Sequence, residues 1–309
     1  MIKYNLKNNF SDKAFYKTSK FFAVSILILI IVMLVSMFYF SWPAIKKFGL
    51  SFLVSMKWNP VLDDFGALPF IYGSLITSLI SLVIAVPLGI GSAIFLTEIA
   101  PPKMSNPLSF IIELLAAVPS VIYGLWALFV LTPLIREYIQ PFLSKYLGFL
   151  SFFQGPMQGV GILAAGIILA IMILPIITSI SKDVLEAVPD EQKQAMLALG
   201  ATRWETMKLI VLPYGKAGII GGIILALGRA IGETMAVTMV IGNVNRISYS
   251  FFALGNTMSS VIANEFSEAV SDIHIGALVE LGLILFVITL ILNILARVLI
   301  FYTSNKLGR

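Results

Sequence analysis

The sequence contains no cysteine and a single histidine, His274. The absence of cysteine excludes disulfide bonds, thiol catalysis and zinc–thiolate sites, and a lone histidine makes neither a metal site nor a catalytic triad. The chain also lacks a G-x-x-x-x-G-K-[ST] phosphate loop, since Gly215-Lys216 is the nearest fragment and the rest of the motif is missing. We therefore expect no catalytic site, no metal site and no ATPase activity in this chain.

Charged residues are scarce. Only 12% of the 309 residues are Asp, Glu, Lys or Arg, whereas 59% are hydrophobic and the mean hydropathy is +0.97. A soluble domain carries about twice that share of charge, so we expect an integral membrane protein surrounded by lipid. The formal net charge of +5 does not indicate a nucleic-acid partner, because the distribution of basic residues matters more than their sum in a membrane protein.

Six apolar segments are long enough to cross a bilayer, whose hydrocarbon core of about 30 Å needs roughly 20 residues of helix. They are residues 21–40, 70–98, 108–135, 157–181, 217–243 and 274–301. The first is too long for a signal-peptide core and has no cleavage site after it, so we expect an uncleaved anchor. The sequence thus predicts an all-α protein with an N-terminal tail, anchor and external loop in residues 1–67 and a core in residues 68–305.

The basic residues predict the orientation of the spans. With the N-terminus inside, 14 of the 21 Lys and Arg residues lie in cytoplasmic segments, 6 in external loops, and only Arg229 lies within a span. We expect a multi-pass protein of the cytoplasmic (inner) membrane with both termini cytoplasmic. The external segment 136–156 is apolar but short, and it is either a helix at the membrane interface or a structured loop packed on the bundle.

The longest cytoplasmic loop, residues 183–213, is predicted to form a helix, a break and a second helix. Gly200 suits a left-handed helix end. Thr202 and Glu205 have the spacing of a capping box, in which each side chain accepts a hydrogen bond from a backbone N–H of the other residue. We expect the second helix to end at Pro213. Apolar side chains on both helices indicate a docking surface, although an amphipathic linker folded under the bundle remains the alternative.

Arg229 and Glu233 lie in the fifth apolar segment, four positions apart, where a helix places them on one face. A lone arginine at the bilayer centre costs about 2.5–3.5 kcal/mol on insertion scales. An ion pair at an effective dielectric near 20 recovers about 4 kcal/mol before desolvation, so the pair roughly cancels its own cost. Two interpretations stay open: a structural ion pair, and a cationic group that faces a water-filled pathway.

The pathway interpretation suits an oxyanion, because the planar guanidinium can bind two oxygens at once and a neighbouring carboxylate can hold it between cargo events. Thr234 belongs to the same candidate pathway. Gly228 and Gly232 have the GxxxG spacing, which lets a partner helix approach closely. We therefore expect the fifth span to line a pore at a subunit interface.

In the cytoplasmic loop, Gly200 is followed at fixed distances by Ile210, Leu212 and Pro213. This spacing resembles the loop of permease subunits in bacterial ABC importers, although Gln194-Ala195-Met196 replaces the family's leading Glu-Ala-Ala. In that family the loop forms coupling helices that insert into a groove on an ATPase subunit. The resemblance assigns ATPase coupling to Ala195, Leu199, Gly200, Ala201, Thr202, Trp204 and Glu205.

The stretch LGRAIGETMAVTMVIGN, residues 227–243, resembles the fifth helix of the C-type permease subunits of phosphate ABC importers. Residues 71–98 (IYGSLITSLISLVIAVPLGIGSAIFLTE) and 114–128 (LLAAVPSVIYGLWAL) extend the resemblance. It implies a type I importer (MetI-like) bundle of six transmembrane helices with a cytoplasmic coupling loop, and phosphate as the cargo. Family members carry functional charges at the positions of Arg229 and Glu233.

The resemblance also implies partners: a sister permease of the A type, two ATPase subunits that carry ATP and Mg, and an extracytoplasmic phosphate-binding protein, besides membrane lipid. No cofactor is expected in this chain itself. A permease for sulfate or molybdate, with the same fold and motor, remains an alternative. So does an ion-coupled secondary carrier that works alone, although no internal repeat is obvious.

Overall fold

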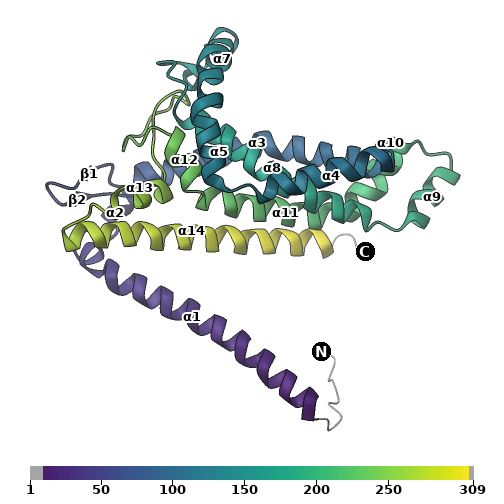
Figure 1. Ribbon diagram of the computed structural model, residues 1–309, viewed down its shortest axis with the longest axis horizontal. Helices are drawn as coiled ribbons and strands as arrows, with labels where there is room; N and C mark the ends of the chain where they lie inside the picture. Colours follow the sequence, from purple (N-terminus) through teal and green to yellow (C-terminus); the bar gives the residue numbers. More distant parts are fainter. Residues whose placement is uncertain (1–9, 306–309) are drawn as a thin grey trace.

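The computed structural model describes residues 10–305, and most of this range is helical (Figure 1). Six helices are long and apolar enough to cross a membrane, as the sequence predicts. They are Asp12–Phe48, Leu68–Ile99, Ser120–Leu147, Ile162–Glu186, Arg203–Gly232 and Asp272–Val298. The expected all-α class with six spans is confirmed. The tail residues Lys3 and Lys7, which contribute to the predicted orientation, lie outside the described range.

Several spans consist of consecutive helical elements, because wide π-type turns interrupt the regular hydrogen-bond pattern. In chain order the elements are α1 (Phe10–Phe48), α2 (Ser51–Val54), β1 (Trp58–Asn59), β2 (Asp64–Phe65), α3 (Leu68–Ile94), η1 (Phe95–Ile99), α4 (Pro102–Ala117), α5 (Ser120–Trp126), η2 (Ala127–Leu131), α6 (Thr132–Leu134), η3 (Ile135–Ile139), α7 (Gln140–Leu147), η4 (Ser151–Phe153), α8 (Ile162–Glu186), α9 (Asp190–Ala198), α10 (Arg203–Thr206), η5 (Met207–Val211), α11 (Leu212–Gly232), α12 (Met235–Val240), α13 (Met258–Glu265) and α14 (Asp272–Asn305).

Helix α8 forms the centre of the bundle, since 72% of its apolar window is buried, a larger share than in any other span. Helices α3 and α11 pack against it at glycines. A Cβ at Gly89 of α3 would come within 2.8 Å of Ile177, and a Cβ at Gly218 of α11 would come within 2.5 Å of Val184. Only glycine permits such approaches, so these positions hold the three helices in close contact.

The third span begins later than the sequence predicts. We expected a helix over residues 108–135, but α4 ends at Ala117, Val118 is extended, and a new helix begins at Ser120 after Pro119. Proline removes a backbone donor and disfavours a helical residue before it, which explains the break. The new helix runs on to Leu147, so the first half of the 136–156 segment is a helical continuation, and its last part, α7, rises away from the bundle (Figure 1).

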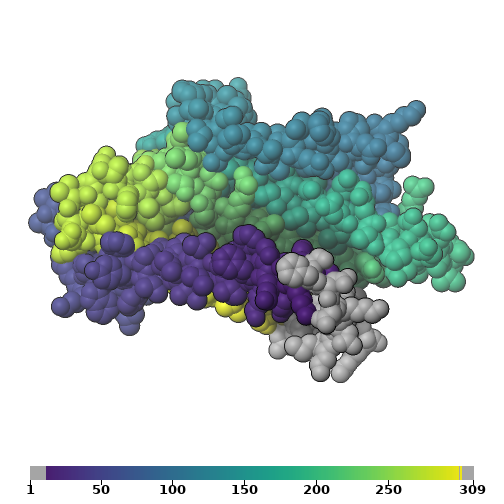
Figure 2. All heavy atoms as spheres, turned by 60° about the horizontal axis from the view of Figure 1, so that its bottom comes forward, coloured from purple at the N-terminus to yellow at the C-terminus, as the bar shows by residue number. Residues whose placement is uncertain are grey.

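Helix α1 diverges from the other spans (Figure 1) and runs across one face of the molecule (Figure 2). Within the described residues, its most apolar window has no buried side chain. Contact with α14 is closest near the end of α1, where Ala44 is buried and a Cβ at Gly276 would lie 3.4 Å from Ala44 Cβ. Most of the apolar surface of α1 is therefore left for lipid or for another chain.

A short hairpin covers the beginning of α14. Strands β1 and β2 are antiparallel, with Trp58 opposite Phe65. Trp58 Nε1 donates to Glu265 Oε2 at 2.8 Å, and His274 Nε2 lies 3.1 Å from the same oxygen. The Phe65 and His274 rings stack with centroids 5.0 Å apart. His274 is thus a buried packing residue that fixes the hairpin to α13 and α14.

Candidate functional site

The fifth span ends inside the stretch that the sequence singles out. Helix α11 ends at Gly232, Glu233 has an extended backbone with ψ 130°, and α12 begins at Met235. The prediction of one continuous helix over residues 217–243 is therefore wrong at Glu233. The physical reason is local: Thr234 follows Glu233, and threonine side chains compete with the helical backbone by bonding to nearby main-chain groups.

Glu233 and Thr234 form such local bonds. Glu233 Oε1 accepts from the backbone N–H of Ala236 at 3.5 Å, which places the carboxylate at the first turn of α12. Thr234 Oγ1 donates to the carbonyl of Gly232 at 3.3 Å. From α13, Ser259 Oγ donates to the carbonyl of Glu233 at 2.7 Å. The non-helical residues Glu233 and Thr234 are thus hydrogen-bonded to α11, α12 and α13.

Arg229 does not form the expected ion pair with Glu233. Within residues 10–305, no Asp or Glu oxygen lies within 4.0 Å of its guanidinium. Because the helix ends between the two residues, their spacing of four positions does not bring the side chains onto one face. The interpretation of the two residues as a structural ion pair is therefore contradicted within the described chain.

The Arg229 side chain lies on an open face of α11. It is exposed, and a Cβ at Gly228 or Gly232 would meet no atom of this chain within 4 Å. Arg229 and Gly232 thus mark a surface that the rest of the described chain leaves uncovered, and the half-buried Gly228 lies at its edge, beside a narrow gap toward α14.

A polar network follows the break. Thr238 Oγ1 lies 2.9 Å from Ser260 Oγ, which donates to Asn243 Oδ1 at 3.0 Å, and Asn243 Nδ2 donates to the carbonyl of Thr238 at 3.0 Å. Asn243 has φ 53°, a left-handed conformation that asparagine tolerates better than most residues. This closed ring of hydrogen bonds fixes α12 to α13.

Helix α3 is bonded to the same region. Ser74 Oγ accepts from the backbone N–H of Met258 at 3.0 Å, at the first residue of α13. One position earlier, Gly73 lies so close to the chain that a Cβ there would be 2.0 Å from the carbonyl oxygen of Asn256. The position of α13, and through Ser259 that of Glu233, therefore depends on α3.

The loop of residues 183–213 has the predicted helix, break and helix. Helix α9 is followed by Gly200 with φ 86°, the left-handed conformation that the sequence predicts. The capping box at the start of α10 is confirmed, since Glu205 N–H donates to Thr202 Oγ1 at 3.2 Å and Thr202 N–H donates to Glu205 Oε2 at 2.7 Å. The expected end at Pro213 is wrong, because the helix continues from Arg203 to Gly232 and the proline lies in the first turn of α11.

Most of the residues with an expected coupling role are exposed. Leu199 is 83% exposed and Trp204 67% exposed, and Ala195, Gly200, Thr202 and Glu205 are also exposed. Ala201 is half-buried. The loop surface formed by Leu197, Leu199 and Trp204 is thus apolar and open at one end of the molecule, where α9 projects beyond the bundle (Figure 1).

Comparison with known proteins identifies the family. Residues 85–302 match the model of the binding-protein-dependent transport system inner membrane component. The chain belongs to this family. Among curated relatives, the phosphate transport system permease protein PstC of Mesorhizobium japonicum is 49% identical over 96% of this chain and 92% of the relative. The protein of the same name from Pasteurella multocida is 46% identical over 98% of this chain and 96% of the relative.

Solved structures agree on the fold of this permease. A bacterial ABC transporter involved in the import of the acidic polysaccharide alginate aligns with a TM-score of 0.62 at 17% identity, covering 92% of this chain and 96% of that chain. The MetNI methionine ABC transporter aligns with a TM-score of 0.52 at 16% identity, covering 75% of this chain and 91% of that chain. The expected MetI-like permease bundle is confirmed.

Sequence reasoning missed two parts of the permease site. The first is the α13 contribution of Ser259 and Ser260, whose only sequence signal is a pair of serines between two apolar spans. The second is an ion pair between Glu98 and Lys193, which are too far apart in sequence for any local pattern to join them. No group of three or more His, Asp or Glu side chains within residues 10–305 is arranged to hold a metal ion.

Proposed function

We propose that this permease is the C-type subunit of an ATP-driven importer of inorganic phosphate. The observation that carries the proposal is the 49% identity to the phosphate transport permease of Mesorhizobium japonicum over 96% of this chain. The relative from Pasteurella multocida, named for the same cargo, supports it over 98% of this chain. Similarity over nearly the full length of both chains favours phosphate over sulfate or molybdate.

In this proposal Arg229 is the group in the pathway that attracts phosphate. Its guanidinium is exposed and, within the described residues, has no carboxylate partner to displace. A planar guanidinium can donate two parallel hydrogen bonds to phosphate oxygens. Glu233 and Thr234 act beside it by holding the break between α11 and α12, so Glu233 shapes the pathway rather than neutralising the arginine.

The open face of α11 suits contact with a sister permease of the A type. Gly228 and Gly232 leave room for a second helix to approach the backbone, which is the role expected of a GxxxG pair. Phosphate would then pass between the two permeases, after release from an extracytoplasmic binding protein. Residues 68–305 form the permease core in this arrangement, and lipid surrounds the outer helices.

The exposed apolar surface of the coupling loop suits an ATPase partner. Two ATPase subunits would bind ATP and Mg, and one would receive Leu199 and Trp204 in a groove. We place this loop and both termini in the cytoplasm, because the excess of Lys and Arg lies on that side. The end of α14 and the coupling loop lie at the same end of the molecule (Figure 1), which agrees with this orientation.

The test is uptake of radiolabelled phosphate at low external concentration, in cells that lack their own high-affinity importer and co-express the expected partners. Arg229→Gln should reduce uptake at least about tenfold, because a hydrogen bond to a charged group contributes about 1.5–3 kcal/mol. Glu233→Gln should reduce it less, since the amide oxygen can still accept from Ala236. The matched control is Arg246→Gln, which removes an exposed arginine from the loop after α12.

The possible outcomes test the cargo, the role of Arg229 and the need for an ATPase separately. Uptake of radiolabelled sulfate or molybdate, without uptake of phosphate, would reassign the cargo and leave the permease family intact. Normal uptake by Arg229→Gln, in a complex that still assembles, would remove the arginine from the pathway. A chain that transports without any co-purifying ATPase would favour the ion-coupled carrier instead.

A further inference from the structure

Helix α9, the first helix of the coupling loop, is loosely attached to the bundle. None of its residues is buried. Among the described residues, the one side-chain hydrogen bond that joins α9 to a membrane span runs from Lys193 Nζ to Glu98 Oε1, at 2.7 Å. A displacement of α9 by a docked partner can therefore reach the spans through this contact.

The Glu98–Lys193 pair has the properties of a firm link. Its side chains are only 26% and 17% exposed, whereas the Lys57–Asp64 pair on the opposite side is 40–75% exposed. Partly buried charges are screened less by salt than exposed ones, and a short charge-assisted hydrogen bond is about twice as strong as a neutral one. The pair joins residues 95 positions apart, so it connects two elements that the chain itself does not connect.

Glu98 lies in η1, the π-type turn that ends the second span. The span runs as a continuous helix from Leu68 to Ile99, about 48 Å at 1.5 Å per residue. Near its other end, Ser74 binds the first residue of α13, and Ser259 of α13 binds the carbonyl of Glu233. A single helix therefore reaches from the coupling loop to the break in the fifth span.

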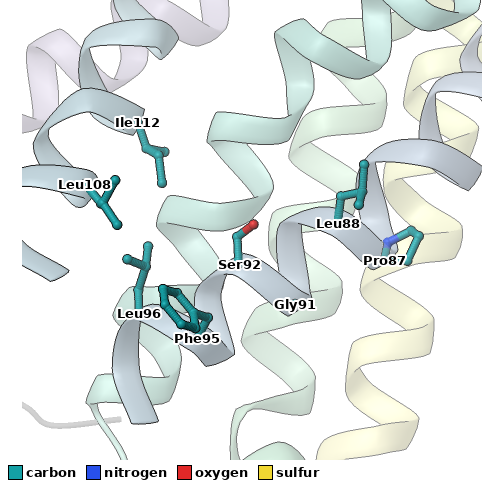
Figure 3. Close-up of a pocket in the computed structure, with 8 residues that line it drawn as sticks. All are labelled: Pro87, Leu88, Gly91, Ser92, Phe95, Leu96, Leu108 and Ile112. Carbon is teal, nitrogen blue, oxygen red and sulfur yellow. The ribbon is translucent and has the colours of Figure 1, made fainter. Parts of the chain in front are cut away.

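The same turn borders an apolar groove. The groove, of about 460 Å³ and open to the surface, lies between the end of the second span and α4. Phe95 and Leu96 of η1 line one side and Leu108 and Ile112 of α4 the other, while Gly91 contributes no side chain (Figure 3). A closely packed contact would resist movement. The groove leaves part of η1 without packing partners in α4, and Ser105 Oγ of α4 donates to the carbonyl of Leu96 at 2.8 Å, so the last turns of the span would carry the start of α4 with them.

We propose that the Glu98–Lys193 pair is the positioning contact through which the coupling helix α9 moves the second span and, through α13, the pathway at Glu233. The inference rests on the proposed function, since it requires an ATPase partner that displaces α9. Glu98 and Lys193 touch neither cargo nor nucleotide. They act by keeping α9 and η1 together during each cycle.

The first test uses the assembled importer in proteoliposomes and measures phosphate transported per ATP hydrolysed. Glu98→Gln and Lys193→Gln should bind the ATPase and hydrolyse ATP, but transport about tenfold less phosphate per ATP, because a charge-assisted hydrogen bond is lost. Because Asp190 Oδ1 lies 3.9 Å from Lys193 Nζ, the charge swap is made with Asp190→Asn, and Glu98→Lys with Lys193→Glu in that background should restore the ratio to within about twofold. The matched control is Glu186→Gln, whose partner Lys182 lies on the same helix, α8.

Two results would overturn the proposal. One is a normal transport ratio in both single variants. The other is a charge swap that stays as low as the single variants while all of them keep the wild-type thermal midpoint.

A second measurement does not depend on the cargo. Because the chain has no cysteine, a spin label attaches only where a cysteine is introduced. We choose two exposed positions, Gln192→Cys on α9 and Leu79→Cys on α3. The distance distribution between them should stay narrow in the native pair and widen in Glu98→Gln. An unchanged distance distribution in Glu98→Gln would refute the inference. Failure of the wild-type complex to transport phosphate would refute the proposed cargo, but the distance measurement would remain a valid test of the contact.

Discussion

The contact between α3 and the segment before α13 depends on the absence of a side chain at Gly73. In Gly73→Ala, the new Cβ would lie 2.0 Å from the carbonyl oxygen of Asn256, and real Cβ atoms essentially never come closer than 3.0 Å to such an atom. The neighbour is backbone, so either α3 or the segment at Asn256 must move by about 1 Å. That shift would also strain the hydrogen bond from Met258 N–H to Ser74 Oγ.

Opposing effects set the expected magnitude. Alanine is favoured over glycine in a helix by about 1 kcal/mol. Overpacking costs about 1–3 kcal/mol and a weakened hydrogen bond about 0.5–1.5 kcal/mol, so Gly73→Ala should destabilise the permease by roughly 0.5–3.5 kcal/mol. At Gly228, where a Cβ meets nothing within 4 Å, the helix preference acts alone. Gly228→Ala should therefore leave the stability unchanged or raise it slightly.

Thermal unfolding of the purified protein in detergent, followed by the decay of the monodisperse peak in size-exclusion chromatography, compares the two variants. Gly73→Ala should lower the midpoint relative to wild type, and Gly228→Ala should not. Equal midpoints for the two variants would refute the reasoning, because they would mean that α3 and the segment at Asn256 are not in close contact. In the assembled importer, Gly228→Ala should still lower phosphate uptake, since the open face is expected to meet a partner or the pathway.

Three further changes test the periphery of the site. Leu199→Asp introduces a charge at a position whose side chain is 83% exposed, so the thermal midpoint of the permease should stay unchanged. The ATPase should no longer co-purify with this variant. Retention of the ATPase would exclude Leu199 from the docking surface. Thr202→Ala removes the capping box, which should cost about 1 kcal/mol of helix stability. Hydrogen–deuterium exchange of the Glu205 backbone N–H should become faster. Unchanged protection of this N–H would show that the Thr202 side chain does not cap the helix. Trp58→Phe keeps an aromatic ring but removes the indole N–H that donates to Glu265 Oε2. It should lower the midpoint by an amount equivalent to about 1.5–3 kcal/mol, as expected for a bond to a charged group; an unchanged midpoint would show that this hydrogen bond does not hold the hairpin.

The parts of the fold that the sequence predicted correctly are those decided by local chemistry. Six apolar runs predict six spans because lipid leaves a backbone no other partner than its own helix. The capping box at Thr202 and the left-handed end at Gly200 were predicted because each depends on residues within a few positions. The effect of proline was predicted wrongly at two positions. Pro119 separates two helices where one span was expected, and Pro213 lies in the first turn of a helix where a helix end was expected. Neighbouring elements, which the sequence does not reveal, decide between these outcomes.

The break at Glu233 changes the argument about Arg229. From sequence, the cost of the arginine in a membrane was balanced by a carboxylate on the same helix face. The structure removes that partner, because Glu233 bonds to the first turn of α12 instead. An exposed arginine that faced lipid would carry the full penalty of about 2.5–3.5 kcal/mol. Arg229 lies in the last turn of α11 and is exposed, so its guanidinium can be solvated from outside this chain. In the proposed importer, water and a passing oxyanion between two permeases would solvate the guanidinium, which acyl chains could not do, and the proposal places the open face of α11 on the pathway for this reason.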